Sequence, residues 1–145
     1  MATYDLAKGG QGGHMRSDQA IFKVPFEVDF ALQGYSSADV LQLVNVPAET
    51  LVHRVKYKVE TVEGATLTFD IGDGSDVDGY IDGANGNSAG SGVNSLALTE
   101  ATPNTVTGYS NGKYYSAADT IDLLLNNDAA AAKISGVVIM EDLSS

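Results

Sequence analysis

Alternation of apolar and polar residues with a period of two is the feature that most constrains what this chain can fold into. Every second residue between residues 21 and 30 is aromatic or branched: Phe22, Val24, Phe26, Val28 and Phe30. Successive side chains of a strand point to opposite faces of a sheet, so the pattern predicts a half-buried strand. Pro25 lacks a backbone N–H, which predicts that this strand lies at a sheet edge or contains a local break.

Similar patterns predict the other strands, which cover residues 40–46, 50–63, 65–72, 93–99, 105–107, 113–115, 120–126 and 134–140. In the strand 65–72, we expect Leu67, Phe69 and Ile71 to face the core. A helix competes with this interpretation in two places, residues 116–125 and the alanine-rich stretch 128–133. We predict a strand in the first region, because its apolar residues are spaced by two. We expect no helix in the second region, because it is too short to be stable alone and begins in a predicted turn at residues 126–129.

About eight strands in one chain of 145 residues predict a single all-β domain. Strands at this spacing are typical of an antiparallel β-sandwich, and eight of them suit a jelly roll. An immunoglobulin-like sandwich is the nearest alternative. The chain contains no Cys and no Trp, two hallmarks of antibody domains, and their absence favours the jelly roll. Spacing alone leaves the choice between the two topologies open.

Residues 1–19 are predicted to form a flexible N-terminal arm in front of a β-sandwich domain of residues 20–145. The arm contains the run Gly9-Gly10-Gln11-Gly12-Gly13, which is too rich in glycine to nucleate stable secondary structure. Tyr4 and Leu6 are apolar residues near this run, and they are candidates for contacts with a neighbouring subunit. The alternative is a terminus that stays disordered.

Residues 72–92 are rich in glycine and aspartate, and we interpret them as a long insertion or an irregular corner. Oxygen ligands on a backbone that can turn freely are what calcium requires, which makes Asp73, Asp76, Asp78 and Asp82 weak candidates for a calcium site. The spacing does not match an EF-hand. We favour the simpler interpretation, a solvated loop whose aspartates form turns by accepting hydrogen bonds from their own backbone.

The chain is acidic, with 8 Lys and Arg against 19 Asp and Glu and a formal net charge of −11. This balance gives no electrostatic reason to bind nucleic acid or an anionic membrane. Arg54, Lys56 and Lys58 nevertheless share one face of the predicted strand 50–63, with Val52 on the same side and His53 beside them. These residues form either an ordinary solvated face or an interface for an acidic partner.

The residues that enzymes need are not arranged in any recognisable pattern. There is no Cys, only two His, and no nucleophile triad, phosphate loop or dinucleotide motif. The strand carboxylates Glu27, Asp29, Glu60 and Asp122 alternate with apolar residues, which is typical of solubilising charges on an outer face. We therefore predict a protein that is not an enzyme and needs no cofactor. No apolar run is long enough to cross a membrane, and the N-terminal residues lack the features of a signal peptide.

Two segments resemble known proteins: residues 67–74 followed by Asp78-Gly79-Tyr80, and the run Lys113 to Ile121. Over residues 38–125 the chain is similar to a group of small tailed-bacteriophage proteins that are encoded among virion structural genes. The resemblance implies a capsid decoration (cement) protein, a β-sandwich that assembles as a homotrimer on the major capsid protein. It would then be made in the host cytoplasm and lie on the outer surface of the head, and it would have no catalytic residues.

Two alternatives to decoration remain open. A tail or fibre-associated receptor-binding module would use the glycine-rich and aspartate-rich residues 72–92 as its recognition tip. A calcium-dependent carbohydrate-binding module or hydrolase would use the same region for its metal, although the chain offers no Trp on which a sugar could stack.

Overall fold

The computed structural model describes residues 21–93, 96–97, 109 and 111–144. Over these residues it contains ten β-strands and no helix. The strands are β1 (Ile21–Asp29), β2 (Val40–Val46), β3 (Thr50–Thr61), β4 (Thr68–Gly72), β5 (Ile81–Asn85), β6 (Gly90–Val93), β7 (Leu96–Ala97), β8 (Lys113–Tyr115), β9 (Asp119–Leu125) and β10 (Lys133–Asp142). The predicted arm, residues 1–19, and the predicted strand 105–107 lie outside the described residues.

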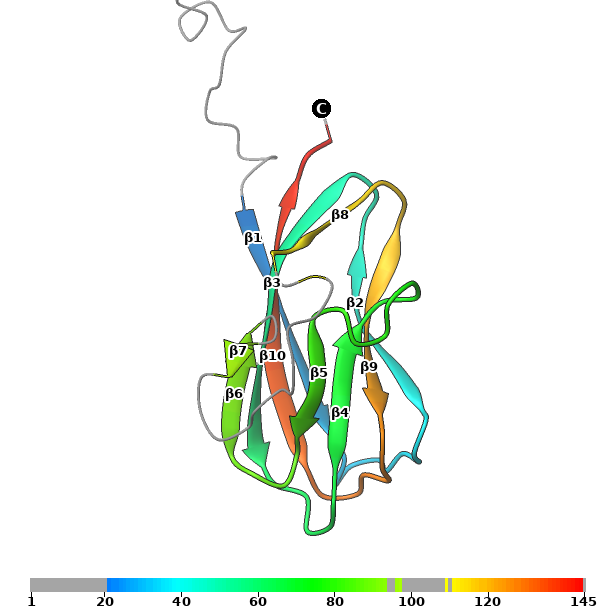
Figure 1. Cartoon of the computed structure of the whole chain (residues 1–145), viewed down its shortest axis with the longest axis vertical. Helices are drawn as coiled ribbons and strands as arrows, with labels where there is room; N and C mark the ends of the chain where they lie inside the picture. Colours follow the sequence, from blue (N-terminus) through cyan, green and yellow to red (C-terminus); the bar gives the residue numbers. More distant parts are fainter. Residues whose placement is uncertain (1–20, 94–95, 98–108, 110, 145) are drawn as a thin grey trace, which may run out of the picture.

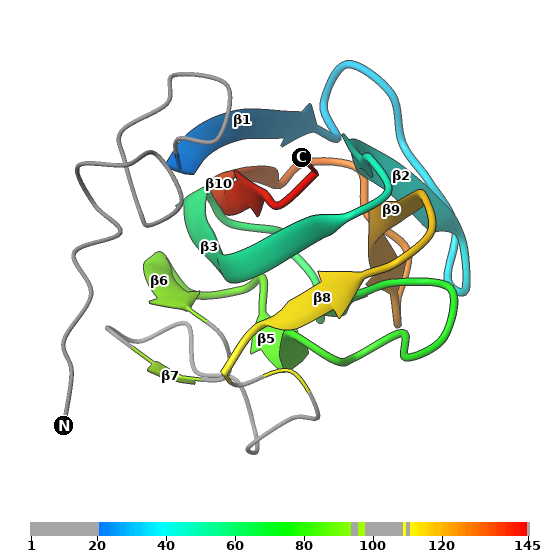
Figure 2. The same cartoon turned by 90° about the horizontal axis from the view of Figure 1, so that it is seen from above.

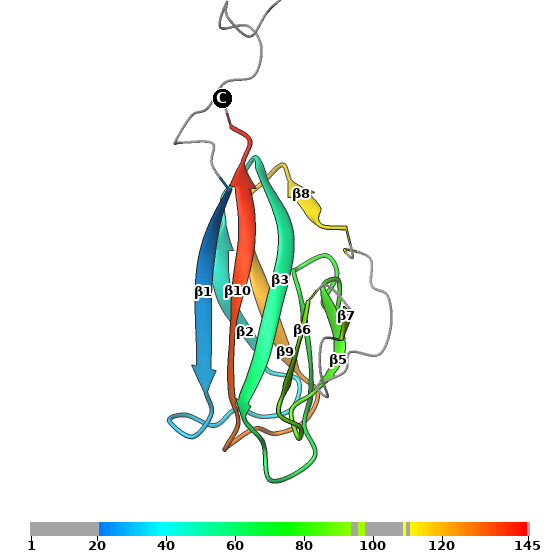
Figure 3. The same cartoon turned by 90° about the vertical axis from the view of Figure 1, so that its left-hand side faces the viewer.

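The strands form two antiparallel sheets that pack face to face (Figures 1 and 3). The larger sheet has the order β1-β10-β3-β6-β7, with β8 paired to one end of β3, and the smaller sheet has the order β2-β9-β4-β5. The principal pairs are nested along the chain, since β4 pairs with β5, β3 with β6, β2 with β9 and β1 with β10. This nesting is the topology of a jelly roll, so the fold prediction is confirmed and the immunoglobulin-like alternative is excluded.

β1 occupies the edge position that its proline predicts. It is the first strand of the larger sheet and pairs along its length with β10. Phe26 and Phe30 of the alternating aromatic face are buried, whereas Phe22 is 39% exposed. The alternation therefore identifies the inward face correctly, and burial decreases towards the end of the strand where the chain enters the sandwich.

The core lies between the two sheets and receives side chains from both. The residues predicted to face inward from the strand 65–72, and the apolar residues spaced by two in the strand 120–126, are all fully buried: Leu67, Phe69, Ile71, Ile121, Leu123 and Leu125. The rings of Phe69 and Tyr57 meet edge to face across the core, with 5.4 Å between their centroids. Each buried side chain of this size contributes about 1.5–3 kcal/mol. Contact between the sheets is therefore a major source of stability.

A bulge in β3 makes one of the predicted face assignments wrong. The alternation places Val52 on the side of Arg54, but Val52 is fully buried. In the register with β10, Arg54 and Val52 pair with consecutive residues, so His53 has no pairing partner of its own in that strand. One additional residue reverses the alternation of side chains across a sheet. Beyond the bulge the prediction is correct, and the inward residues are Val55, Tyr57 and Val59.

The interpretation of residues 72–92 as an insertion or irregular corner is wrong. Two strands of the sandwich, β5 and part of β6, lie within this stretch. Tyr80 and Ile81 are fully buried where β5 begins. Glycine conceals these strands because it has no side chain to contribute to an alternating pattern. At Gly86 a side chain would collide with Leu67, so this turn between β5 and β6 needs glycine to approach the core.

The alanine-rich stretch is an irregular connection between β9 and β10, and a buried carboxylate holds it in place. The carboxylate of Glu63 accepts hydrogen bonds from the backbone N–H groups of Ala130, Ala131 and Ala132 at 2.8–3.2 Å. Burial raises the pKa of Glu63, but these backbone hydrogen bonds outweigh it and leave the pKa below its ordinary value. Glu63 therefore ties the corner after β3 to the last turn of the sandwich.

Candidate functional site

The outer face of the larger sheet carries three exposed cations, Arg54, Lys56 and Lys58, which we call the cation column. They occupy alternate positions of β3 and therefore share one face, as the sequence predicts. β3 lies in the interior of the sheet, between β10 and β6 (Figure 3). Within the described residues, none of the three cations forms an ion pair. The cation column is thus a surface of positive charge on an acidic protein.

Apolar surface lies directly beside the cation column. Val137 and Ile139 of β10 pair with Lys56 and Arg54, respectively, and both are half-buried. The carbon stems of lysine and arginine can cover such aliphatic surface while their charged groups remain in water. This face therefore combines charge with accessible apolar area, which suits contact with another protein.

Contacts with carboxylates lie at both ends of the cation column. His53 Nε2 is 2.9 Å from Glu141 Oε1 at one end. At the other end Lys133 Nζ is 3.6 Å from a carboxylate oxygen of Glu27 and 3.6 Å from one of Glu60. The attraction of these two carboxylates raises the pKa of Lys133 above its ordinary value. His53, predicted as an interface residue, is thus already engaged with Glu141.

Residues 76–78, in the connection between β4 and β5, form what we call the acidic tip. Asp76 and Asp78 flank Val77, which is 49% exposed. A hydrogen bond that protonated Asp78 donates to Asp76, together with burial and the negative charge nearby, raises the pKa of Asp78 to about 6. A nearby cation would relieve this repulsion. The connection projects to the right in Figure 1, away from the outer face of the larger sheet (Figures 1 and 2).

Asp73 is fully buried and accepts hydrogen bonds from several donors. Lys113 Nζ and the Tyr115 hydroxyl each lie 2.7 Å from its carboxylate, and the Tyr109 hydroxyl lies at 3.2 Å. Two backbone N–H groups of the following turn donate to it at 2.9 Å. Burial raises the pKa of Asp73, but the hydrogen bonds from Lys113 and Tyr115 outweigh it and keep the pKa below its ordinary value.

The predicted behaviour of the acidic residues is therefore partly correct. Asp73 forms a turn with its own backbone, as expected, but it is not solvated. Within the part of the chain that the structure describes, no three His, Cys, Asp or Glu residues form a group that could hold a metal ion. Calcium binding by Asp73, Asp76, Asp78 and Asp82 stays a prediction, and the carboxylate of Asp73 already has its donors.

Tyrosine side chains complete the cluster around Asp73. The hydroxyls of Tyr80 and Tyr115 lie 2.7 Å apart, and the rings of Tyr80 and Tyr109 pack with 5.0 Å between centroids. Lys113 Nζ lies 4.5 Å from the ring centroid of Tyr109 and 4.7 Å from that of Tyr115. Burial raises the pKa of Tyr80 and of Tyr115 well above the ordinary value, so both remain neutral donors at physiological pH. The cluster thus anchors the β4–β5 connection to β8.

No alternation pattern reveals the Asp73 cluster, but the charge distribution contains one signal of it. Lys113 is the only Lys or Arg between residues 59 and 132. A single cation in a long acidic stretch is a reasonable partner for a buried carboxylate, since buried charges are normally paired. The sequence does not indicate which of the many aspartates that partner is.

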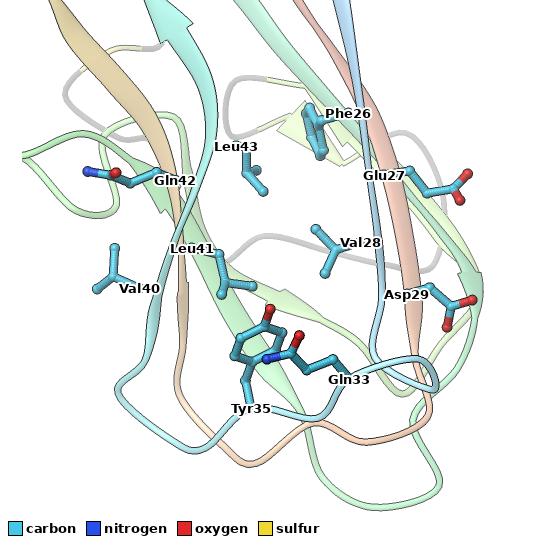
Figure 4. A pocket seen from close by; sticks show the side chains of 10 residues that line it. All are labelled: Phe26, Glu27, Val28, Asp29, Gln33, Tyr35, Val40, Leu41, Gln42 and Leu43. Atoms are coloured by element: carbon cyan, nitrogen blue, oxygen red, sulfur yellow. The ribbon is translucent and has the colours of Figure 1, made fainter.

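A groove with a volume of about 740 Å³ opens between β1 and β2, the edge strands of the two sheets (Figure 4). The apolar side chains that line it come from both strands and the connection between them: Phe26, Val28, Tyr35, Leu41 and Leu43. Glu27 and Asp29 point away from the groove (Figure 4). The groove therefore presents apolar side chains beside polar groups such as Gln33, and the two carboxylates are not placed to transfer protons within it.

Both walls of the groove carry features that discourage pairing with a further strand. Pro25 removes one backbone donor from β1, and the register of β2 shifts between Gln42 and Val44. Proline and bulges are common means of protecting the edges of sheets. The groove is therefore better suited to receive side chains than to extend either sheet.

The remaining candidate residues are dispersed or lie outside the described structure. Asp122 is on the outer face of the smaller sheet and bonds to the Thr120 hydroxyl at 2.6 Å, whereas Glu60 is on the outer face of the larger sheet. These two carboxylates therefore do not face each other across a cleft. Tyr4 and Leu6 lie outside the described residues. Among the residues that are described, no helix is long and apolar enough to cross a membrane.

Comparison with solved structures places the fold among chains of bacteriophage capsids. A chain of the cyanophage Pam1 capsid has a TM-score of 0.60 and 16% identity, over 90% of both chains. A chain of the capsid of Ralstonia phage GP4 has a TM-score of 0.60 and 12% identity, over 96% of both chains. A chain of the acid-stable capsid of Helicobacter pylori bacteriophage KHP30 has a TM-score of 0.58 and 12% identity, over 87% of this chain and 91% of that one. No family model and no curated protein matches the sequence. At these identities the similarity shows a shared fold.

Proposed function

We propose that this protein is a non-enzymatic structural component of a tailed-phage virion, and specifically a capsid decoration protein. It binds the major capsid protein on the outer head surface as a homotrimer and stabilises the particle. The observation that carries the proposal is the match over nearly the whole chain to chains of three phage capsids. Because the matched shares of each pair of chains are nearly equal, the neighbours are chains of about this size and not large proteins that contain such a domain.

The physical properties of the chain support a role in assembly. A net charge of −11 favours solubility before assembly. The absence of Cys makes the protein independent of redox conditions, which differ between a host cytoplasm and the outside. The cation column and the groove between β1 and β2 give it two surfaces suited to protein contacts, and neither contains an arrangement of groups for catalysis among the described residues.

The tail-associated alternative depends on residues 72–92 forming a long recognition loop. Two strands of the sandwich occupy much of that stretch, and the connection between β4 and β5 projects from it (Figure 1). The structure therefore offers less support for a receptor-binding tip than for a compact module with flat binding surfaces.

The decisive experiment locates the protein on the particle. We expect quantitative mass spectrometry of purified heads to find it in a fixed ratio to the major capsid protein, and cryo-electron microscopy to show its density on the outer surface. Heads prepared without it should gain thermal stability when the purified protein is added back. Its absence from emptied heads would refute decoration, and antibody labelling confined to tails would support the alternative.

A further inference from the structure

We infer that copies of this chain associate head to tail, with the acidic tip of one copy seated on the cation column of the next. The acidic tip is residues 76–78, and the cation column is Arg54, Lys56 and Lys58. The inference rests on the homo-oligomer included in the proposed function and names the surfaces through which it forms.

The two surfaces match in both charge and polarity. The acidic tip presents two carboxylates on either side of Val77, which is 49% exposed. The cation column presents three positive charges beside the half-buried Val137 and Ile139. In the proposed contact the carboxylates pair with the cations and the exposed valine covers part of this aliphatic surface. Apolar burial then supplies affinity, while the charges set the orientation and speed the encounter.

Neither surface has opposite charge paired with it among the residues that the structure describes. The three cations form no ion pair with the described residues, and they occur on a protein with eleven more negative than positive charges. In the acidic tip, Asp76 and Asp78 lie close enough to share a hydrogen bond, and the negative charges nearby further raise the pKa of Asp78. Bringing the two surfaces together would pair the cations of one copy with carboxylates of the next and would reduce the repulsion between Asp76 and Asp78.

The positions of the surfaces require the contact to form between copies. The connection that contains the acidic tip projects on one side of the sandwich, and the outer face of the larger sheet lies on the other side (Figures 1 and 2). A contact between two different surfaces of identical chains is heterologous, so it closes into a ring when the rotation permits and otherwise continues as a filament. A ring of three is the closed form that agrees with the proposed trimer.

The test is the self-association of the full chain, measured by sedimentation velocity over a range of protein concentrations. We expect association that weakens when NaCl is raised from about 0.05 M to about 0.5 M, because salt screens exposed charges. Lys56→Glu and Asp78→Lys should each weaken association by about tenfold or more. The double variant Lys56→Glu/Asp78→Lys restores opposite charges across the contact and should recover most of the affinity.

Matched controls separate this contact from a general effect of net charge. Thr66→Glu/Asn45→Asp changes the net charge by as much as Lys56→Glu does, and Thr66→Lys/Asn45→Lys by as much as Asp78→Lys does, at exposed positions outside both surfaces and the groove. Both controls should associate like the wild type, and all variants should keep the wild-type melting profile within a few degrees. A wild-type chain that is monomeric at every concentration, or a Lys56→Glu variant that associates normally, would overturn the inference.

Binding to heads is measured separately, so the two proposals can fail independently. A protein that decorates heads but shows no association through these surfaces would contradict the head-to-tail contact alone. A protein that associates as described but is absent from heads would contradict decoration alone.

Discussion

Asp73 shows how a single buried carboxylate can fix the position of a connection. An ionised carboxylate that is removed from water without partners is strongly destabilising. Here Lys113, the tyrosine hydroxyls and two backbone N–H groups satisfy it together, and in return they are held in place. Because the network joins the β4–β5 connection to β8, it constrains two segments that are far apart in the sequence.

Asp73→Asn tests the strength of this network. The variant keeps the shape of the side chain but removes the charge that pairs with Lys113, so we expect the free energy of unfolding to fall by about 3–5 kcal/mol. Tyr80→Phe removes only a peripheral hydroxyl from the network and should cost about 1 kcal/mol. Urea denaturation followed by circular dichroism measures both. Equal costs for the two variants would show that the charge of Asp73 is not central to the network.

At the scale of elements, corners are as important as strands. Glu63 lies after β3, yet its carboxylate binds three consecutive N–H groups between β9 and β10. Without the Glu63 carboxylate, these three N–H groups would each lose an acceptor. The loss matters most at Ala132, because this residue is fully buried. The Glu63 side chain therefore satisfies the backbone N–H groups of this connection, as pairing with a neighbouring strand satisfies those of a strand.

We expect Glu63→Gln to lower the free energy of unfolding by about 1–3 kcal/mol, because the amide has one acceptor oxygen in place of two and carries no charge. Glu60→Gln is the matched control, since Glu60 is exposed and its ion pair with Lys133 is 3.6 Å long. The control should change stability by less than about 1 kcal/mol. Chemical denaturation of both variants tests this, and a larger effect at Glu60 would contradict the role assigned to Glu63.

The strands that the sequence predicts best are those whose burial follows the period of two. β9 is the clearest case, because its fully buried residues Ile121, Leu123 and Leu125 occupy alternate positions, so the pattern and the structure agree. β5 and β6 escape prediction because glycine and other small residues carry little hydrophobic signal. The bulge at His53 escapes as well, since an additional residue in one strand is defined only by its pairing with β10.

At the scale of the whole molecule, parts of the binding surfaces could be predicted and others could not. The cation column lies on one strand, so alternation alone places its residues on one face. The groove and the Asp73 cluster each combine segments that are distant in the sequence, and only the nested pairing of strands brings these together. The acidic residues were visible in the sequence, but their division into a buried anchor and an exposed tip depends on the fold.

The carboxylates also determine how the stability of the whole molecule varies with pH. The folded protein raises the pKa of Asp78 to about 6, and burial raises those of Asp70 and Asp122. These groups bind more protons in the folded state, so stability should increase as the pH falls from 7 to about 5. Asp73 and Glu63 have lowered pKa values, and their contribution should be lost below about pH 4.

Melting temperatures measured between pH 7 and pH 3 should therefore pass through a maximum. Asp78→Asn should melt above the wild type at pH 7. The difference should disappear as the pH approaches about 3, below the ordinary aspartate pKa, where Asp78 is protonated in both the folded and the unfolded chain. A constant difference across this range would show that the ionisation of Asp78 does not oppose folding.

The antiparallel pairing of β1 with β10 has a mechanical consequence. Ile21 pairs with Glu141, so β1 begins where β10 ends, and the hydrogen bonds between them run perpendicular to the strands. A tensile force that draws the chain before Ile21 away from the chain after Asp142 would open this ladder one rung at a time, as in unzipping. A force applied along β1, between Ile21 and the opposite end of the sandwich, would load all the hydrogen bonds of this strand pair together in shear. If a pressurised shell pulls on this protein through its first residues, the protein would resist unfolding most strongly when its other attachment lies at the opposite end of the sandwich, near Asp29.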